Sequence, residues 1–489
     1  MKSRSGAIPV SALVLAAGQG KRMKSDRVKL LHELGGAPMV CHVARAAAHL
    51  EPATLAAVVG NQGAQVTAAL SGEPGLIEAG LCFVTQQRQL GTAHAVLQAE
   101  PLLKRAGKFK GDLLILNGDV PLIRPSTLRA LLRHHRRQRA AATVLTTLVD
   151  DPAGYGRVVR DDEGELVSIV EDRDASAHQR KIREINAGLY CADLSLLFSA
   201  LKRTGRSNAQ GEYYLPDLFP ILRSQGRRIA AYLHADAEEV LGVNDRAELA
   251  RAGRVLYRRR AAELMASGVT IVDPDCTYID PGVRVGRDTI IHPLARIEGR
   301  SRIGSGCVIG SLSHIADTTL ADNVLVRDMC VISDSTISTG AKIGPFAHIR
   351  PGTVLGQDVH VGNFVEVKKS RVGRGSKANH LTYLGDAVIG EGCNVGAGTI
   401  TCNYDGVHKH TTTLEDRVFI GSNSALVAPV KIGRGAYVGA GSVITRDVPA
   451  GALGLTRAPQ RIIEDWAERR RRELETPPKR QRRRKRGKA

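Results

Sequence analysis

A six-residue repeat between Thr270 and Gly451 constrains the fold of this 489-residue chain more than any other feature. A hexapeptide period is typical of a parallel β-helix, in which each unit supplies one short strand and one turn, with its aliphatic side chain facing inward. Glycine suits the turn because its backbone tolerates positive φ. Regular phasing disfavours the alternative, a β-sandwich with glycine-rich turns. The aliphatic-glycine pairs are Val285-Gly286, Ile303-Gly304, Ile309-Gly310, Ile343-Gly344, Leu355-Gly356, Val361-Gly362, Ile389-Gly390, Val395-Gly396, Ile432-Gly433 and Val438-Gly439.

Length and composition indicate two domains with extensions, because 489 residues exceed the size of a single core. No apolar run approaches the ~20 residues needed to cross a bilayer, and the first residues lead straight into a strand pattern without a cleavable apolar segment. These features predict a cytoplasmic protein. The eight cysteines are scattered and show no metal-binding spacing, so we expect them to be reduced and mostly buried.

Half of the net charge of +20 lies in the last 21 residues, where twelve Lys or Arg face two Glu. This tail has few apolar residues and contains Pro477-Pro478, so we expect residues 458–489 to remain unfolded. It could bind an anionic partner such as nucleic acid or lipid non-specifically, with an affinity that falls as salt rises. A solvated tail without a partner is the alternative.

Residues 8–252 alternate apolar strand-like runs with helical patterns, which predicts an α/β domain with a mostly parallel sheet. In such sheets, ligands bind at the carboxyl ends of the strands. The expected strands are Ala12–Leu15, Leu55–Val59, Leu81–Thr85, Leu113–Leu116, Thr143–Leu148 and Ile185–Tyr190.

A glycine-rich loop with basic residues follows the first expected strand. Gly18 and Gly20 would let backbone N–H groups approach a phosphate, and Lys21, Arg22 and Lys29 supply the positive charge that a triphosphate needs. The loop matches neither the P-loop nor the dinucleotide-binding pattern. Taken alone, it could equally be a tight turn between strand and helix.

Asp119 follows another central apolar strand, in the sequence Leu116-Asn117-Gly118-Asp119-Val120-Pro121. A carboxylate at this position is costly unless it binds a cation or pairs with a charge. Magnesium commonly takes one or two carboxylates together with substrate phosphates. We therefore expect Asp119 to be a metal ligand, with a turn cap as the alternative.

Six motifs occur in the order found in sugar nucleotidyltransferases. With the hexapeptide repeats behind them, the chain outside its basic tail resembles the family of bifunctional N-acetylglucosamine-1-phosphate uridylyltransferases / glucosamine-1-phosphate acetyltransferases. This resemblance implies a Rossmann-like nucleotidyltransferase domain followed by a left-handed parallel β-helix. The motifs are Leu15-Ala16-Ala17-Gly18-x-Gly20-x-Arg22-Met23, Gln89-Leu90-Gly91-Thr92-Ala93-His94-Ala95, Gly118-Asp119-Val120-Pro121, Gly154-Tyr155-Gly156-Arg157, Glu184-Ile185-Asn186-Ala187-Gly188 and Gly242-Val243-Asn244.

The resemblance implies a site for UTP, Mg²⁺ and a sugar phosphate in the first domain. A sugar-phosphate oxygen would attack the α-phosphate of UTP and release pyrophosphate without a general base, because the phosphate is already ionised. The sequence departs from the family pattern at Lys21 and Val28, where a small hydroxyl residue and proline are usual. By resemblance, uridine would contact Leu15, Ala16, Ala17, Gly18, Gln86, Gly91 and Thr92, and the triphosphate would contact Arg22 and Lys29. The metal would bind Asp119 and Asn244, and the sugar phosphate would contact Gly156, Glu171, Asn186 and Asn244.

Polar residues unusual for a β-helix lie just before an interruption of the repeat at Cys402–Thr413. Insertions in a solenoid map to one face, which is often the binding face. Arg350 and Lys368 would make a phosphate clamp, and His380 is the obvious candidate for a base near neutral pH.

The resemblance implies an acetyltransferase in this second domain. His380 would deprotonate the amine of glucosamine-1-phosphate as it attacks acetyl-CoA, with Glu366 orienting the histidine. Hexapeptide acyltransferases of this kind are homotrimers with sites between neighbouring subunits. The implied contacts are Arg350, Lys368, Tyr383 and Asn394 for the sugar phosphate, and Ala397, Asn403, Tyr404, Ser422, Ala440 and Arg457 for acetyl-CoA.

The leading hypothesis is a two-reaction enzyme of UDP-N-acetylglucosamine synthesis. One alternative is a single-function nucleotidyltransferase with a structural or regulatory β-helix. Another is a non-catalytic regulatory or nucleic-acid-binding protein, which would not need Lys29, Asp119 and Asn244 together. The expected boundaries are 8–252 for the first domain, 253–268 for a linker helix, 269–457 for the β-helix and 458–489 for the tail.

Overall fold

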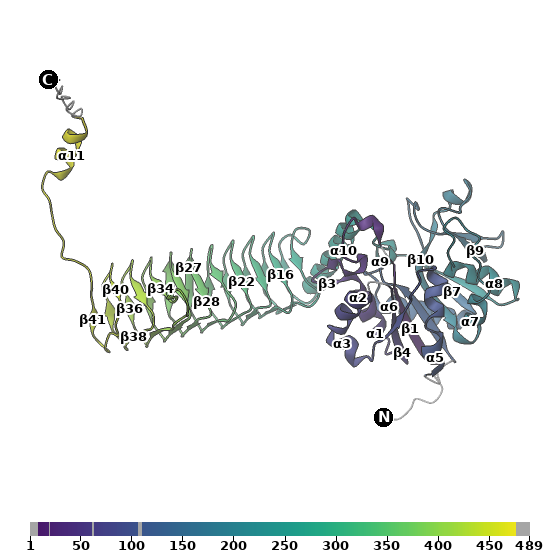
Figure 1. Ribbon diagram of the computed structural model, residues 1–489, viewed down its shortest axis with the longest axis horizontal. Helices are drawn as coiled ribbons and strands as arrows, with labels where there is room; N and C mark the ends of the chain where they lie inside the picture. Colours follow the sequence, from purple (N-terminus) through teal and green to yellow (C-terminus); the bar gives the residue numbers. More distant parts are fainter. Residues whose placement is uncertain (1–7, 19, 61–62, 106–109, 476–489) are drawn as a thin grey trace, which may run out of the picture. The chain divides into compact units, whose positions relative to one another are not determined.

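The computed structural model describes residues 8–18, 20–60, 63–105 and 110–475. The chain divides into two compact units, residues 1–329 and 330–489. The first unit contains a sheet with helices on both faces, a long helix and the first β-helix coils, and the second contains the later coils and a C-terminal helix (Figure 1). The first unit thus extends past the expected boundaries near residues 252 and 269, which stay predictions.

The N-terminal sheet is mixed, with the strand order β11-β7-β10-β6-β1-β4-β5 and the hairpin β8-β9 attached to β10. β1 pairs in parallel with β4 and β6, whereas β10 runs antiparallel to both β6 and β7. All six expected strands are present, and the sequence prediction missed β8, β9 and β11. The strands are β1 (Val10–Ala16), β4 (Thr54–Val59), β5 (Cys82–Thr85), β6 (Asp112–Asn117), β7 (Ala142–Leu148), β8 (Arg157–Arg160), β9 (Leu166–Val170), β10 (Glu184–Asp193) and β11 (Ile229–His234).

Helices cover both faces of this sheet because its central strands are apolar on both sides. Along β1, Ala12 and Val14 pack into the core under one set of helices, and Leu13 packs into the core on the opposite face. The first face carries α1 (Met39–Ala48), α2 (Gly63–Ser71), α3 (Pro74–Glu78) and α6 (Pro125–Gln138); the second carries α4 (Thr92–Leu97), α5 (Glu100–Arg105), α7 (Leu194–Leu201) and α8 (Leu218–Ser224).

The long helix α10 (Arg246–Ala266) follows the sheet domain and begins seven residues before the linker helix expected at 253–268. Asp245 caps its start by accepting a hydrogen bond from the Glu248 N–H. Ala252 and Val255 of α10 pack with Val243 and Leu122 in a small separate core. The helix therefore begins against the loop that follows β6.

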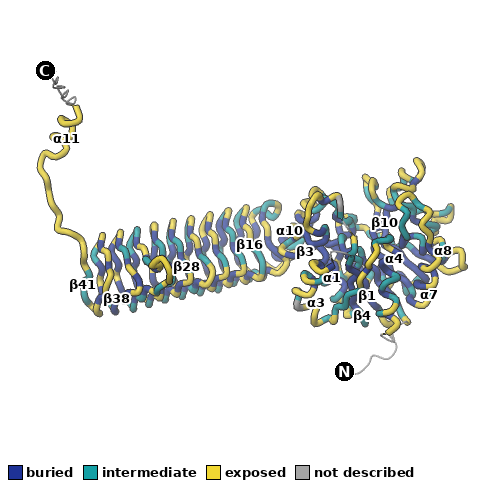
Figure 2. The backbone as a smooth tube through the Cα atoms, viewed as in Figure 1, coloured by how far each residue is buried: buried dark blue, intermediate teal, exposed yellow. Residues whose placement is uncertain are grey.

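The β-helix coils consist of very short strands stacked in three parallel ladders, with alternately buried and exposed residues (Figure 2). Of the ten aliphatic residues expected to face inward, nine are buried, as at Ile303 and Ile309, and Val285 in the first coils is partly exposed. This confirms the hexapeptide prediction. In the first unit the ladders contain β12 (Thr270–Ile271), β15 (Ile290–Ile291), β18 (Val308–Ile309) and β21 (Leu325–Val326); β13 (Tyr278–Ile279), β16 (Arg296–Glu298) and β19 (His314–Ala316); and β14 (Arg284–Val285), β17 (Arg302–Ile303) and β20 (Thr319–Leu320).

The second unit continues the same three-ladder pattern. Its first ladder contains β24 (Lys342–Ile343), β27 (His360–Asn363), β30 (Lys377–His380), β33 (Asn394–Val395), β36 (Phe419–Ile420), β39 (Tyr437–Val438) and β41 (Leu453–Gly454). The second contains β22 (Val331–Ser333), β25 (His348–Ile349), β28 (Glu366–Lys368), β31 (Tyr383–Gly385), β34 (Ile400–Cys402), β37 (Ala425–Val427) and β40 (Val443–Ile444). The third contains β23 (Ser335–Ile337), β26 (Thr353–Leu355), β29 (Arg371–Val372), β32 (Ala387–Ile389), β35 (Thr412–Leu414) and β38 (Val430–Ile432).

The prediction of an unfolded tail is wrong for α11 (Trp466–Glu475), which is an exposed helix. Ion pairs one turn apart, Arg470 with Glu473 and Arg472 with Glu468, support a helix that buries nothing. Residues 476–489 lie outside the described residues, and an anionic partner for the tail stays a prediction.

Two sequence predictions concern the chain as a whole. Among the described helices, none combines the length and the apolar character that crossing a membrane requires. Among the residues that the structure describes, none of the eight cysteines forms a disulfide; five of them are buried, whereas Cys82, Cys276 and Cys402 are partly exposed.

Candidate functional sites

A cavity of about 1190 Å³ lies at the carboxyl ends of β1 and β6, where the strand pattern placed the ligand site. Of the residues predicted for the nucleotidyltransferase site, eleven line this cavity and three do not. Ala16 belongs instead to the buried core, and Gly156 and Asn186 are buried next to each other, with Gly156 close to Glu171. The eleven lining residues are Leu15, Ala17, Gly18, Arg22, Lys29, Gln86, Gly91, Thr92, Asp119, Glu171 and Asn244.

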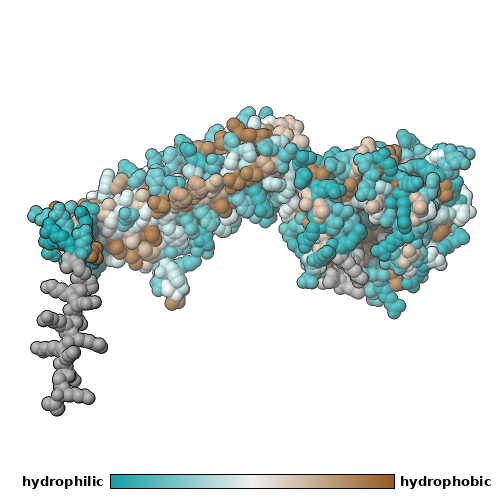
Figure 3. All heavy atoms as spheres, turned by 90° about the horizontal axis from the view of Figure 1, so that it is seen from above, coloured by the Kyte–Doolittle hydropathy of each residue, from teal (hydrophilic) through white to brown (hydrophobic). Residues whose placement is uncertain are grey.

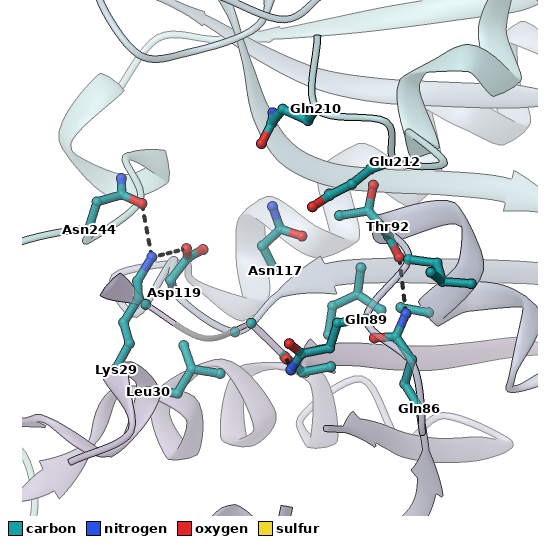
Figure 4. Close-up of a pocket in the computed structure, with 18 of the residues that line it drawn as sticks. Lys29, Leu30, Gln86, Gln89, Thr92, Asn117, Asp119, Gln210, Glu212 and Asn244 are labelled. Atoms are coloured by element: carbon teal, nitrogen blue, oxygen red, sulfur yellow. Dashed lines mark hydrogen bonds and ion pairs between the residues drawn. The ribbon is translucent and has the colours of Figure 1, made fainter. Parts of the chain in front are cut away.

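Lys29 joins the two predicted metal ligands (Figure 4). Its Nζ lies 2.6 Å from Oδ2 of Asp119 and 2.9 Å from Oδ1 of Asn244. Arg22 donates to the same Asn244 oxygen at 2.8 Å. Val28, which precedes Lys29, has φ −53°, close to the value that proline would fix, so the backbone reaches this turn without proline.

The oxygens of Asp119 and Asn244 fit a magnesium ion. Both lie within hydrogen-bonding distance of one cationic nitrogen, so they converge on a single cation-sized position. Within the part of the chain that the structure describes, no group of three or more His, Cys, Asp or Glu could hold a metal ion. A cation here would therefore take two protein oxygens and complete its coordination with substrate phosphates and water, as Mg²⁺ commonly does.

The side chain of Gln86 is fixed by hydrogen bonds at the other end of the cavity. Gln86 is buried, and its Nε2 donates to the carbonyl oxygen of Gly91 at 3.2 Å and lies 2.9 Å from Nδ1 of His94. These contacts direct the amide oxygen away from its own anchors, where it can accept from a ligand N–H. Gly91 has φ +111°, and a Cβ there would lie 2.4 Å from the Tyr213 carbonyl oxygen, so glycine is required at this turn.

Glu171, one of the predicted sugar residues, lies in a partly buried acidic wall of the cavity. Burial raises the pKa of Glu171, and the charges of Asp174, Asp217 and Asp172 raise it further. A Cβ at Gly156 would lie 3.3 Å from Oε1 of Glu171, which explains the small residue there. Glu171 is thus a carboxylate in need of hydrogen-bond donors, and sugar hydroxyl groups would supply them.

Asn186 has its hydrogen-bonding groups engaged inside the protein. Its amide donates to the Tyr190 hydroxyl at 2.8 Å, and its side-chain oxygen accepts from the Gly188 N–H at 2.9 Å. Asn186 is 9% exposed and lies behind the cavity. In this structure it supports the bend of β10, where the register with β7 shifts between Asn186 and Tyr190.

Glu171→Gln should stabilise the protein at neutral pH while weakening the sugar site. Because the folded state raises the pKa of Glu171, the stability that this group contributes falls as pH rises above the ordinary value of 4.5. The variant should therefore unfold at a higher temperature than wild type at neutral pH, with a smaller difference near pH 4.5. Its KM for the sugar phosphate should rise roughly 10–100-fold, as expected for one lost charged hydrogen bond. Glu163→Gln, in the exposed β8-β9 turn, is the control; equal unfolding temperatures for Glu171→Gln and wild type at neutral pH would contradict the argument.

Sequence reasoning missed several residues that line the same cavity. Asn117 lies between the metal end and the amide end, and Gln210 and Glu212 form the wall opposite Lys29 (Figure 4). Gln89 donates to the Ala17 carbonyl oxygen at 2.5 Å and fixes the glycine-rich loop. Asn117 could have been inferred because it ends β6, but Gln210 and Glu212 come from a segment without a recognisable pattern.

In the second unit, His380 is exposed at the end of β30 and receives its orientation from Asn363. Nδ1 of His380 lies 2.8 Å from Oδ1 of Asn363, its register partner in the preceding coil. Because an amide oxygen only accepts, this contact favours the tautomer with the proton on Nδ1, which leaves the lone pair on Nε2. Glu366, which the sequence suggested as the orienting residue, is instead held by Arg350 at 2.7 Å. The ion pair between Glu366 and Arg350 of the preceding coil explains why Glu366 does not orient His380.

Cationic residues gather on the ladder of β28, which is not the ladder that carries His380. Lys368 follows Glu366 on β28, and its ammonium group lies close enough to Lys409 to lower the pKa of Lys409. Lys409 comes from the loop at Cys402–Thr413, which the sequence had identified only as an insertion. Tyr383 is the register partner of Glu366, whereas Asn394 lies on the neighbouring ladder. The predicted clamp of Arg350 and Lys368 therefore has a third cation.

Four of the six predicted coenzyme residues line one edge of the β-helix beyond His380. The Gly398 N–H donates to the His380 carbonyl oxygen, and hydrogen bonds from Asn423 to Ala397 and from Gly441 to Ser422 continue the stack. Arg457 ends it by donating to the Ala440 carbonyl oxygen at 3.1 Å. These four residues are Ala397, Ser422, Ala440 and Arg457.

Small corner residues leave the edge open, since a Cβ at Gly441 would have no neighbour within 4 Å. The other two predicted coenzyme residues belong to the adjacent loop. Asn403 is buried and donates to Asp386 at 2.5 Å, and Tyr404 is exposed.

Comparison with known proteins is consistent with both sites. A MobA-like NTP transferase domain matches residues 12–184, a GMPPB C-terminal domain matches 275–378, and six bacterial transferase hexapeptide repeats match 411–446. Proteins named bifunctional protein GlmU match over nearly the whole chain. The one from Anaeromyxobacter sp. is 51% identical over 468 residues, covering 96% of this chain and 94% of the relative. The one from Heliobacterium modesticaldum is 48% identical over 456 residues, covering 93% and 97%.

Proposed function

Because this chain belongs to the family of bifunctional GlmU proteins, it is both a uridylyltransferase and a glucosamine-1-phosphate acetyltransferase. We propose that residues around Lys29 carry out the first reaction and that His380 carries out the second. The convergence of Lys29, Asp119 and Asn244 at the strand ends carries the assignment of the first reaction. The His380–Asn363 pair, together with the Lys368 and Lys409 cluster on another ladder of the same unit, carries the second. The family is bifunctional, so the single-function reading is not supported.

In uridylyl transfer, the protein has to bring two anions together. Lys29 and Arg22 neutralise the triphosphate, and Gln86 accepts from the uracil N–H. The N-acetylglucosamine-1-phosphate oxygen attacks the α-phosphate, and pyrophosphate leaves toward the cations. Asp119 and Asn244 would hold Mg²⁺, which neutralises phosphate charge when bound. With a cation held there, Lys29 would be released from these oxygens and could contact the phosphates.

In acetyl transfer, the phosphate of glucosamine-1-phosphate binds the cations Arg350, Lys368 and Lys409. Nε2 of His380 accepts a proton from the amine as its nitrogen attacks the thioester carbonyl of acetyl-CoA. The carbon–sulfur bond then breaks, and the proton on His380 passes to the leaving coenzyme A thiolate. Asn363 keeps the histidine in the tautomer that can accept this proton. The coenzyme follows the open edge toward Arg457, whose guanidinium would pair with a phosphate.

A homotrimer is supported by an exposed apolar edge on the second unit. Phe346, Phe364 and Leu381 occupy the same corner in successive coils and are 46%, 55% and 62% exposed. All three have positive φ, between 49° and 56°, a backbone conformation that is unfavourable for bulky residues. Phe346 and Phe364 stack with ring centres 5.2 Å apart. Apolar side chains gather along the β-helix surface (Figure 3). Retaining large apolar groups at strained, exposed corners is consistent with their burial between subunits in a cyclic assembly.

Phe364→Glu should dissociate this assembly. Light scattering should show a mass falling from about three times 52.4 kDa toward the single-chain value, because a buried charge at an interface is costly. Acetyl transfer should fall at least about tenfold, since its site is expected between subunits, and uridylyl transfer should remain. Val388→Glu, a comparable exposed position on another ladder, is the control. A Phe364→Glu variant that keeps the mass of the wild type would contradict this proposal.

A further inference from the structure

The start of helix α10 is built around the backbone of Asn244. In the usual capping box, the acidic side chain at the third helical position bonds the N–H of the capping residue. Here Asp245 is the capping residue and accepts from the Glu248 N–H at 2.9 Å. Glu248, however, reaches one residue further back and accepts from the Asn244 N–H at 2.5 Å. The Glu248 carboxylate therefore holds the backbone of Asn244, the residue whose side chain faces the cation position.

The neighbouring contacts show why this bond matters for the side chain of Asn244. The preceding residue, Val243, is fixed because its N–H donates to the Asp119 carbonyl oxygen at 2.8 Å and its side chain lies in a buried core. With Val243 held on one side and Glu248 holding the Asn244 N–H, the peptide plane cannot rotate freely. Oδ1 of Asn244 is thereby directed at Lys29 Nζ and, through it, at Asp119.

We propose that Glu248 is a positioning residue of the uridylyltransferase site, which acts by holding Asn244 in the orientation that binds the cation. This inference rests on the proposed role of Asn244 as a metal ligand. It makes the first turn of α10 part of the site without any contact between Glu248 and the substrate. Partners that orient metal ligands typically change metal affinity or activity 10–100-fold when they are removed.

The test compares three substitutions of Glu248, which separate the effects of its acceptor oxygen, its charge and its length. Glu248→Gln keeps an acceptor oxygen at the same reach and should stay within about twofold of wild type. Glu248→Ala removes the acceptor. Glu248→Asp keeps the negative charge at the helix start but is one methylene too short. Both should raise the Mg²⁺ concentration required for half-maximal pyrophosphate release about tenfold or more. Glu263→Gln, an exposed acid on the same helix, is the matched control.

Two further measurements separate positioning from a general loss of stability. Mn²⁺ binding to the full-length protein in the presence of UTP, followed by electron paramagnetic resonance without turnover, should weaken in parallel for Glu248→Ala and Glu248→Asp. Acetyl transfer by the same samples should not change. Adding Glu248→Ala to Asn244→Ala should produce little further effect, because the two residues act in series.

Distinct outcomes overturn the inference and the assignment beneath it. If Asn244→Ala leaves the Mg²⁺ dependence unchanged, the metal role of Asn244 is wrong. If Asn244→Ala shifts that dependence but Glu248→Asp does not, the positioning role of Glu248 alone is wrong. Equal metal-binding losses for Glu248→Gln and Glu248→Asp would also exclude it, and this pair decides the question even if Glu248→Ala does not fold.

Discussion

His380→Ala should lower the rate of acetyl transfer by roughly 10²–10⁴-fold, the usual range for loss of a general base. The reason is that His380 supplies the Nε2 lone pair, with Nδ1 fixed 2.8 Å from Asn363. Release of coenzyme A thiol from acetyl-CoA and glucosamine-1-phosphate measures this activity. Pyrophosphate release in the same preparation should match wild type.

Two controls make the result specific to this histidine. His314→Ala removes a histidine from an earlier β-helix coil, where it pairs with Glu298, and should leave both activities intact. Asn363→Ala should give an intermediate loss of acetyl transfer, because the base remains but its tautomer is no longer fixed. Normal acetyl transfer by His380→Ala would refute the assignment. Loss of both activities would instead contradict independent sites.

Asp119→Ala should lower uridylyl transfer by roughly 10²–10³-fold, the size seen when one electrostatic group is removed from a preorganised site. Asp119 supplies the negative charge at the converging oxygens, and its loss also leaves Lys29, whose side chain is 11% exposed, without its ion-pair partner. Pyrophosphate release from UTP and N-acetylglucosamine-1-phosphate, measured over a range of Mg²⁺ concentrations, checks this expectation.

Asp119→Asn is the informative companion because it keeps an oxygen at the same position and removes only the charge. It should need more Mg²⁺ than wild type yet retain more activity than Asp119→Ala at saturating metal. Acetyl transfer serves as the internal control for folding of the chain. If Asp119→Ala transferred uridylyl groups at the wild-type rate, Asp119 would have no part in the reaction.

The candidate sites were largely predictable where a motif carried several residues together. Gln86 and Asp119 follow strand ends, and Lys29 follows the glycine-rich loop after β1. The cavity unites them because parallel strands bring their carboxyl ends to one edge. Gln210 and Glu212 lie in a loop whose path depends on the whole domain, so no local pattern identified them. The same limit explains why Glu366 was expected to orient His380 but pairs with Arg350 instead. Which charged partner Glu366 takes depends on the neighbouring coils.

The sequence by itself determined the β-helix, because a six-residue period is local and each aliphatic side chain has one inward direction to take. It also determined the α/β class of the first domain and most of its strands. Only the tertiary structure decided that β10 runs antiparallel between β6 and β7, that Asn363 orients His380, and that Glu248 holds Asn244. These outcomes depend on contacts between segments distant in the chain or between neighbouring coils, where geometry and competing partners, rather than residue type, select the bond that forms.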